Sequence, residues 1–301
     1  MTKVAAVQFQ FFRAHSVADM EARLIAAIEP VVERGAQLVA LPQYMGLSLL
    51  GAAGAGDDPA PVLRKKGTAL LKAFKETCSG LAARFGVWLV PGSTIGADDE
   101  LLVAQAYLFG PDGGVVGCQR QTHLGAREKA WGLTCGDSLD VFETPLGRIG
   151  LVVGQDVRAP EVARILVLQG ANVLIHVAAM PAPFDEETWL ASLWREVQAN
   201  QVFGIEACLV GECFGQTYAG RSAIHAPVEM TEDGRGIVAQ SSTTEGEQPV
   251  LAELHLSALQ RAVDSYNIFR YFNYGLYARE LPEAYRRSQR PIRNTQHVSY
   301  C

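Results

Sequence analysis

The 301-residue sequence lacks the short motifs of the commonest nucleotide-binding, zinc and serine enzymes. It contains no GxGxxG and no GxxxxGK[ST] segment, which excludes the usual glycine-rich cradles for dinucleotides and nucleoside triphosphates. It has neither an HExxH pair for zinc nor the GxSxG turn that presents a serine nucleophile. The stretch GSTIG at residues 92–96 comes close to the last pattern, but we interpret it as a turn at a strand end.

Charge is also scarce in this chain. Charged residues make up 19% of the sequence and the net charge is −6, so the electrostatic footprint of a nucleic-acid-binding protein is missing. One small basic cluster lies near the C-terminus, where a solvated tail or a subunit contact explains it better than phosphate binding. It comprises Arg286, Arg287, Arg290 and Arg293. No stretch approaches the roughly 18 consecutive apolar residues of a membrane span, and MTKVAAVQFQ has no signal region, so we expect no membrane contact.

The cysteines are scattered along the chain without a CxxC pair. They are Cys78, Cys118, Cys135, Cys208, Cys213 and Cys301. In a chain of this length that spacing favours free thiols in a reducing compartment over a disulfide framework. Cys208 with Cys213 is weak support for zinc, so we expect no metal site. Apolar residues make up 49% of the chain, enough for a sizeable core, and we expect a cytoplasmic globular protein without a cofactor.

Hydrophobic periodicity predicts strands that alternate with helices. Residues 3–9 alternate as a first strand, and Ser16-Val-Ala-Asp19 resembles a capping box. Apolar residues at every fourth position from Met20 then predict one buried helix face. We expect Pro30 to kink or end this helix, because proline removes a backbone donor and clashes with the preceding turn. Residues 37–41 predict a buried strand.

The remaining elements follow the same alternation. Residues 51–67 are rich in small and turn-forming residues and predict a loop, after which an apolar stripe predicts a helix over 70–85. Further strands are expected at 87–90, in hairpins over 101–109 with 115–120 and 139–143 with 149–153, and at 172–177, 205–210, 222–226, 236–239 and 250–255. Further helices are expected from Pro160 and over 186–201. Mixed sheets with helices on their outer faces follow, in a single domain over 1–280 with a C-terminal tail at 281–301.

Three segments at strand ends carry a more specific signal. They are GAQLVALPQYMGLS at 35–48, RQTHLG at 120–125 and GRIGLVVGQDVRAPEVAR at 147–164. Together they resemble the nitrilase, or carbon–nitrogen hydrolase, superfamily, and the resemblance extends from VAAVQ to residue 226. It implies a four-layer αββα sandwich of two mixed sheets with helices outside, usually paired through helices into a dimer. It also implies a Glu, a Lys and a Cys that cleave amides, nitriles or carbamoyl groups through a covalent intermediate.

All three catalytic positions differ from that family pattern. The family's LPE reads Leu41-Pro42-Gln43 here, and the Lys of RKTHL is replaced by Gln121. The Cys of CYDVRFPE is replaced by Gly154. Gln43 cannot accept a proton at neutral pH, Gln121 carries no charge, and Gly154 has no side chain with which to form a covalent bond. The resemblance thus implies the setting of a cysteine hydrolase without its reactive groups.

Three further residues are candidates for the lining of a ligand pocket. Glu128 falls near a second Glu that the family uses to orient the catalytic groups, although a surface position on a loop is an equal alternative. Gln155 adjoins Gly154 in the turn before a helix. His176 lies inside a strand near the expected pocket, where a hydrogen-bonded core histidine is the favoured interpretation over a catalytic base.

Three functions remain open from the sequence. The first is a pseudoenzyme that binds a small polar ligand, amide- or carboxylate-bearing, or acts as a regulatory subunit. The second is a hydrolase of carbon–nitrogen bonds with relocated chemistry, in which Asp156 or Glu128 activates water, or Cys208 or Cys213 supplies a thiol. The third is a structural partner subunit, since the aromatic-rich segment 266–277 suits an interface or closes the protein's own core. In each case we expect a homo-oligomer, a dimer or larger.

Overall fold

The computed structural model describes residues 1–98 and 101–288. The strands are β1 (Thr2–Gln10), β2 (Leu38–Ala40), β3 (Trp88–Val90), β4 (Ser93–Asp98), β5 (Leu101–Phe109), β6 (Val115–Arg120), β7 (Val141–Thr144), β8 (Gly147–Val153), β9 (Val173–Ala178), β10 (Phe203–Cys213), β11 (Gln216–Tyr218), β12 (Ala223–His225), β13 (Ile237–Gln240) and β14 (Gln248–Leu254). The helices are α1 (Val17–Glu33), α2 (Ala60–Phe85), α3 (Ala126–Ala130), α4 (Pro160–Leu168), α5 (Glu186–Trp189), α6 (Arg195–Asn200), α7 (Leu256–Ser265) and α8 (Tyr274–Ser288).

The strands form one curled sheet with two halves. Its path runs β4-β5-β3-β2-β1-β10-β9-β8-β7, and β6 and β14 add to the first half beside β5 and β1. The halves meet where β1 and β10 run parallel over two residue pairs at the end of β1. Parallel pairs in the middle of each half and antiparallel hairpins at the edges give the mixed sheets that the sequence pattern predicted.

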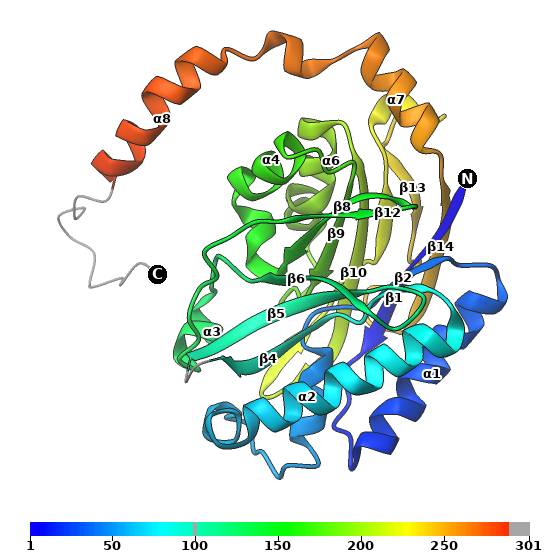
Figure 1. Ribbon diagram of the computed structural model, residues 1–301, viewed down its shortest axis with the longest axis vertical. Helices are drawn as coiled ribbons and strands as arrows, with labels where there is room; N and C mark the ends of the chain where they lie inside the picture. Colours follow the sequence, from blue (N-terminus) through cyan, green and yellow to red (C-terminus); the bar gives the residue numbers. More distant parts are fainter. Residues whose placement is uncertain (99–100, 289–301) are drawn as a thin grey trace.

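The two halves stack face to face with helices outside them (Figure 1). Apolar side chains of β1, β2 and β5 pack against those of β8, β9 and β10 in one buried cluster between the halves. A second cluster lies beneath α1 and α2, and a third lies beneath α4 and α6. The architecture is therefore the four-layer αββα sandwich expected from the sequence.

Local signals in α1 are confirmed, with one exception. The Ser16 side chain accepts a hydrogen bond from the Asp19 amide at 3.0 Å, as a capping residue should. Met20 and the apolar residues that follow it at every fourth position, Leu24 and Ile28, are fully buried. Of the two outcomes expected for Pro30, a kink or the end of the helix, the second is wrong, because α1 continues to Glu33. Val31, directly after the proline, is buried in the core, and this packing holds the last turn in helical conformation.

Three other predictions need correction. The loop expected over 51–67 ends at Pro59, and α2 begins at Ala60, whose amide is capped by the Asp58 carboxylate at 3.0 Å. The segment GSTIG is not a turn at a strand end but enters β4, which pairs with β5 along its length. The helix expected over 186–201 is present in pieces, because Ser192 leaves helical geometry between α5 and α6.

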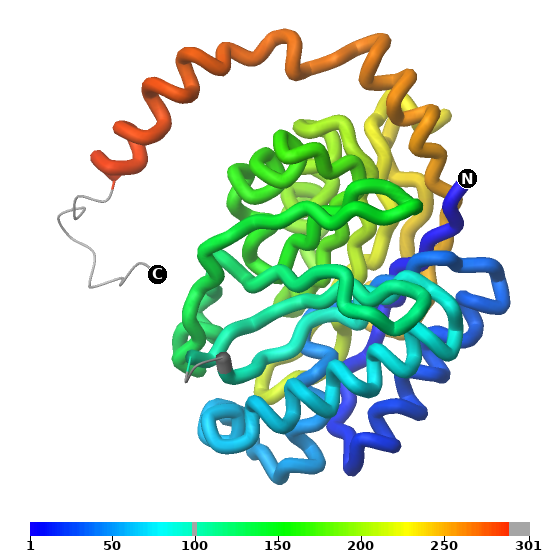
Figure 2. The backbone as a smooth tube through the Cα atoms, in the orientation of Figure 1, coloured from blue at the N-terminus to red at the C-terminus, as the bar shows by residue number. Residues whose placement is uncertain are grey.

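The C-terminal arm, defined here as residues 256–288, follows β14, and its first helix, α7, still packs on the sandwich through the buried Leu259. Figure 2 shows the arm arching over one end of the molecule, and the Tyr285 hydroxyl on α8 donates to Glu161 on α4. The predicted domain boundary at residue 280 falls inside α8 and stays a prediction. Tyr271 is 75% exposed and Tyr274 51%, so this aromatic segment does not close the protein's own core. Arg290, Arg293 and Cys301 lie outside the described residues.

The cysteines differ from expectation at one position. Cys135 is disulfide-bonded, so the prediction of free thiols is wrong there. Four others are not in disulfides, namely Cys78, Cys118, Cys208 and Cys213. Across residues 1–98 and 101–288, no helix has both the length and the apolar character needed to cross a membrane.

Candidate functional site

The three positions singled out by the catalytic pattern lie together at strand ends. Gln43 follows β2, Gln121 follows β6 and Gly154 follows β8. All three are buried, and Gln43 Nε2 donates a hydrogen bond to Gln121 Oε1 at 3.4 Å. The fold therefore brings into contact residues that are far apart in the sequence, as the resemblance predicted.

Gly154 stands where the Gln43 carboxamide leaves no room for a side chain. Its φ of +52° lies in the left-handed region that glycine adopts without strain. A Cβ added to Gly154 would lie 2.4 Å from Gln43 Nε2 and 2.7 Å from Gln43 Oε1. The space beside the turn is thus filled by Gln43, and any side chain at 154 would require that carboxamide to move.

Gln121 is fixed by the backbone around it. Its amide donates to the carbonyl of Ala104 at 2.9 Å, and its carbonyl accepts from the Gly136 amide at 2.7 Å. Its side-chain Nε2 donates to the His123 carbonyl at 2.8 Å. The carboxamide oxygen of Gln121 consequently faces Gln43, and its nitrogen is turned toward its own chain.

Asp156 holds the segment that carries Gln121. Its carboxylate accepts from the amides of Thr122 at 2.9 Å and His123 at 2.7 Å, and from Thr122 Oγ1 at 2.9 Å. His123 Nδ1 lies 3.2 Å from the same carboxylate, and this hydrogen bond raises the pKa of His123. Asp156 is fully buried and does not line the pocket in front of Gln43 that is described below, so it is a structural residue.

His176 is also structural, as the favoured interpretation held. Its Nδ1 lies 2.9 Å from Glu206 Oε1, and its Nε2 donates to the carbonyl of Gly154 at 3.0 Å. Burial alone would raise the pKa of Glu206, but His176 and His225 nearby lower it to about 2. Ser192, at the break between α5 and α6, donates to Glu206 Oε1 at 2.9 Å. This buried cluster supports the turn at Gly154 from behind.

A pocket of about 200 Å³ opens in front of Gln43. Of the residues proposed from the sequence, Gln43, Glu128 and Gln155 line it, whereas Gly154, Gln121 and His176 are not among its lining residues. The alternative of a surface position for Glu128 is wrong, because its side chain is buried in α3. The full lining is Gln43, Tyr44, Gly125, Ala126, Arg127, Glu128, Gln155, Ala179, Pro181, Gln216 and Tyr218.

Two residues that were not predicted from the sequence, Tyr44 and Arg127, make the main polar contacts around the Glu128 carboxylate and the neighbouring wall of this pocket. The Tyr44 hydroxyl donates to Glu128 Oε1, and burial followed by the Glu128 charge raises the pKa of Tyr44 well above its ordinary value. Arg127 donates to the Tyr218 hydroxyl and to the carbonyl of Cys213 at 2.6 Å. Arg127 is thus directed into the protein, and Glu128 is the carboxylate that faces the pocket. Neither contact has a sequence signal, because each depends on how α3 docks.

The described lining lacks the thiol that the family pattern uses as its nucleophile, and it also lacks an aliphatic hydroxyl, an amine and an imidazole. Among the described lining residues there is no Cys, Ser, Thr, Lys or His. Cys208 and Cys213 do not supply a thiol, since both are buried and burial raises the pKa of Cys213 to about 12. Within the described ranges, no group of three or more His, Cys, Asp and Glu side chains is placed to hold a metal ion.

Comparison with known proteins identifies related sequences. A family model described as carbon-nitrogen hydrolase matches residues 3–262. The chain is 32% identical over 187 residues to a nitrilase from Pyrococcus abyssi, covering 62% of this chain and 66% of that protein. It is 30% identical over 194 residues to the probable hydrolase YhcX of Bacillus subtilis, covering 60% of this chain and 36% of that protein. The chain therefore matches only about a third to two thirds of the length of these relatives.

Solved structures resemble the fold over more of the chain. A mutant of the amidase from Nesterenkonia sp. AN1 matches with a TM-score of 0.72 at 21% identity, covering 89% of this chain and 99% of that chain. Another mutant of that amidase, in complex with butyramide, matches with a TM-score of 0.71 at 22% identity, covering 89% and 97%. At such identities the likeness concerns the fold, and it agrees with the sandwich described above.

Proposed function

We propose that this chain, which belongs to the carbon–nitrogen hydrolase family, binds a small amide-bearing ligand without hydrolysing it. The site is the pocket that Gln43 and Glu128 line, called the Glu128 pocket below. The Glu128 carboxylate is an acceptor for the N–H groups of a primary amide. The carboxamides of Gln43, Gln155 and Gln216 supply donors and acceptors for the rest of the ligand. A pocket of about 200 Å³ admits only a small molecule.

The observation that carries this proposal is the missing nucleophile. Gly154 occupies the strand-end turn, and the neighbouring space is filled by the neutral carboxamide of Gln43. In a hydrolase whose catalytic residues act as a unit, loss of the nucleophile costs roughly 10⁶-fold in turnover. The carboxamides of Gln43 and Gln121 retain hydrogen-bonding capacity, but they neither transfer protons nor carry charge at neutral pH.

Relatives of the fold supply a precedent for binding without a complete site. A double mutant of the Nesterenkonia amidase was solved in complex with acrylamide, and another mutant of it in complex with butyramide. Those are properties of that amidase. They support the idea that a sandwich of this kind holds a small amide when its reactive groups are altered.

Titration with butyramide, followed by ligand-observed NMR, tests the proposal. We expect saturable binding, with butyramide recovered unchanged. Gln43→Ala is expected to weaken binding about tenfold, which corresponds to about 1.4 kcal/mol for a lost hydrogen-bonding partner. Gln260→Ala is the matched control, because Gln260 lies on α7 and bonds only the neighbouring Asp264 side chain among the described residues. Equal affinity for the wild type and Gln43→Ala would contradict this assignment of the pocket.

A second candidate function is hydrolysis by relocated chemistry, favoured by the position of Glu128. Among the groups suggested by the sequence, the Asp156 carboxylate already accepts hydrogen bonds from backbone amides, and Cys208 and Cys213 are buried. Glu128 alone among these faces the pocket, where it could act as a general base on water. Ammonia release that disappears in Glu128→Gln would favour this function over binding alone.

We further propose that the chain forms a homodimer through α4 and the C-terminal arm. An apolar cleft of about 760 Å³ lies between them, and exposed Leu168, Tyr274 and Leu281 belong to its surface. Large exposed apolar patches of this kind are typical of subunit contacts. Light scattering should give a dimer mass for the wild type and a monomer mass for Leu281→Glu. A wild-type monomer at all concentrations would contradict the proposal.

A further inference from the structure

The Glu128 carboxylate is a buried charge without a cation partner. Glu128 is only 4% exposed, and among the described residues no Lys, Arg or His nitrogen lies within ion-pair distance of it. Its Oε1 accepts a hydrogen bond from the Tyr44 hydroxyl, and its Oε2 accepts none from the described part of the chain. An ionised carboxylate is costly to remove from water unless it is paired with a cation and hydrogen-bonded on several sides. The pocket therefore contains an unpaired negative charge.

Arg127 also lines the pocket, but its guanidinium is engaged by other groups. It donates to the Tyr218 hydroxyl, to the carbonyl of Cys213 at 2.6 Å and to the carbonyl of Phe214. These three acceptors lie on β10 and β11 and on the turn between them, so they fix the guanidinium on that side of the pocket. A bound ligand is the remaining source of positive charge for Glu128.

The second carboxylate oxygen of Glu128 lies beside a glycine in the pocket wall. A Cβ added to Gly125 would lie 2.7 Å from Glu128 Oε2 and 3.4 Å from Gln155 Cγ, so the missing side chain leaves room beside this oxygen. Gln43 Nε2 already donates to Gln121, and the Gln43 Oε1 atom is left to accept an N–H group. The lining thus offers one charged and several neutral acceptors for the N–H groups of a ligand.

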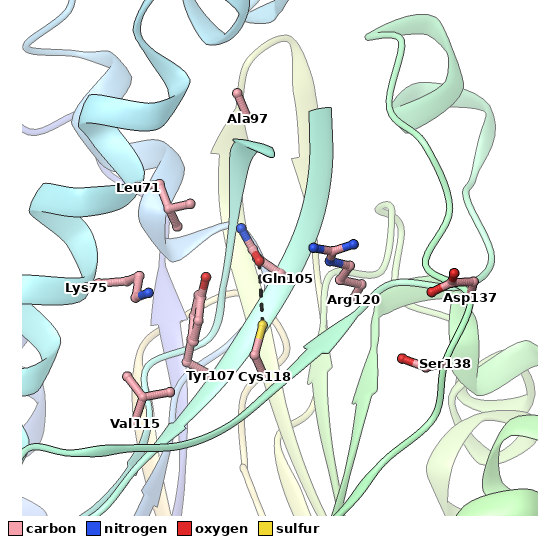
Figure 3. Close-up of a pocket in the computed structure, with 10 residues that line it drawn as sticks. All are labelled: Leu71, Lys75, Ala97, Gln105, Tyr107, Val115, Cys118, Arg120, Asp137 and Ser138. Carbon is pink, nitrogen blue, oxygen red and sulfur yellow. Dashed lines mark hydrogen bonds between the residues drawn. The ribbon is translucent and has the colours of Figure 1, made fainter. Parts of the chain in front are cut away.

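The larger cavity between α2 and the β5–β6 hairpin differs in this respect (Figure 3). It has a volume of about 510 Å³, and among the described residues that line it no carboxylate is buried. Asp137 in its lining is exposed, so water solvates that charge. The buried Gln105 is neutral, and its Oε1 accepts a hydrogen bond from Cys118 Sγ at 3.5 Å. An unpaired buried charge therefore distinguishes the Glu128 pocket from this cavity.

We infer that the Glu128 pocket prefers a small cation with a planar amidinium or guanidinium head over the neutral amide of the same shape. An amidinium replaces the carbonyl oxygen of a primary amide by a second nitrogen donor and adds one positive charge. Two of its N–H groups match the two oxygens of a carboxylate, and such charge-assisted hydrogen bonds are roughly twice as strong as neutral ones. Its other N–H groups match the carboxamide oxygens of Gln43 and Gln155. The inference rests on the proposed function, because it takes the same pocket to be the ligand site.

Ligand-observed NMR with the full chain at neutral pH and constant ionic strength tests the inference. The probes are butyramidine, propylguanidine, butyramide and butyrate, which have similar size and differ in the charge of the head group. We expect at least one of the two cations to bind about tenfold or more tightly than butyramide and to compete with it, and butyrate not to bind. Binding of butyramidine alone or of propylguanidine alone identifies the head group.

Three variants assign the preference to the Glu128 charge. Glu128→Gln should abolish it, so that the cation binds no more tightly than butyramide, and retained binding of butyramide shows that this variant is folded. Glu76→Gln removes the same charge from an exposed site on α2, and as the matched control it should change the affinity for the cation by less than about twofold. Gly125→Ala keeps the charge but crowds Oε2, and it should weaken binding of the cation more than binding of butyramide.

The outcomes separate this inference from the proposed function. If butyramide binds and neither cation binds more tightly, the inference is overturned and the proposed function stands. If a cation binds and butyramide does not, the inference holds and the assignment of an amide ligand is wrong. Absence of binding by all four probes overturns both. A preference for the cation that persists in Glu128→Gln, or that falls as much in Glu76→Gln, also overturns the inference.

Discussion

Two polar clusters lie on opposite sides of the turn at residues 154–158. One contains only neutral side chains, and the other contains a buried carboxylate. The cluster at the pocket side contains the neutral carboxamides of Gln43 and Gln121, joined by one long hydrogen bond. The cluster behind the turn contains the Glu206 carboxylate, which contacts His176 and Ser192 at 2.9 Å. Charge is absent from the first cluster and present in the second, which supports the backbone of the turn.

This difference indicates which features the fold itself requires. Buried charges that are hydrogen-bonded on several sides cannot lose a partner cheaply, because the remaining charge is left in a low-dielectric interior. Gln43 and Gln121 carry no charge, so exchanging either for another neutral side chain leaves no buried charge without a partner. We therefore expect neutral replacement to be tolerated at Gln43 and Gln121, and not at Asp156 or Glu206.

The largest expected effect follows from removing the charge of Asp156. Asp156→Asn turns an amide nitrogen toward donors that the carboxylate accepted from, and should lower the free energy of unfolding by roughly 3–5 kcal/mol. Gln43→Met, at the pocket side, should lower it by less than about 1 kcal/mol. Urea unfolding measures both. Similar losses for the two variants would break the distinction between the clusters.

The next effect is the pH dependence that Glu206 contributes. Its pKa is about 2 in the folded protein, below the ordinary value of 4.5, so its stabilisation is present above about pH 4.5. It is lost as the pH falls toward 2, and it amounts to roughly 3 kcal/mol in total. Urea unfolding at about pH 5 and about pH 3 should show a smaller drop for Glu206→Gln than for the wild type. An equal drop in the two proteins would show that Glu206 does not contribute to the pH dependence of stability.

A smaller effect is expected for the one carboxylate on the pocket side. Tyr44→Phe removes the hydroxyl that donates to Glu128, and should cost about 1–2 kcal/mol of stability. Tyr266→Phe, on the exposed arm, is the control and should change stability by less than about 0.5 kcal/mol. If Tyr44→Phe behaves like the control in thermal unfolding, Glu128 does not depend on Tyr44.

An effect of similar size tests how Gln43 fills the space beside Gly154. Gly154→Ala should cost about 1–2 kcal/mol, from the positive φ and from displacement of the carboxamide. Gln43→Ala in the same chain should relieve the second part, so the double variant should lose less than the sum of the single variants. Strict additivity in a double-mutant cycle would show that the two positions do not compete for space.

Much of the fold was predictable, because it depends on local patterns. Strand alternation, the Ser16 cap and the two hairpins are short-range signals, and all appear as expected. The errors arose where tertiary packing outweighed local preference. Pro30 stays inside α1 because Val31 is buried, and β4 forms because β5 offers a full edge for pairing.

The site was predictable in part for the same reason. The meeting of Gln43, Gln121 and Gly154 followed from family motifs at strand ends. That Gln43 fills the space beside Gly154 did not follow, since it depends on a contact between two halves of the sheet. The contacts of Tyr44 and Arg127 could not be predicted either, because they depend on where α3 packs, and the hydrophobic pattern of the sequence does not determine that position.

The most direct test of the central claim is ammonia release from a panel of amides, nitriles and carbamoyl compounds. The wild type is compared with the triple variant Gln43→Glu/Gln121→Lys/Gly154→Cys. The account predicts no release by the wild type and measurable release by the triple variant, because the fold already brings the three positions together. Turnover by the wild type would contradict the account and would place the chemistry on other residues, with Glu128 the first to examine.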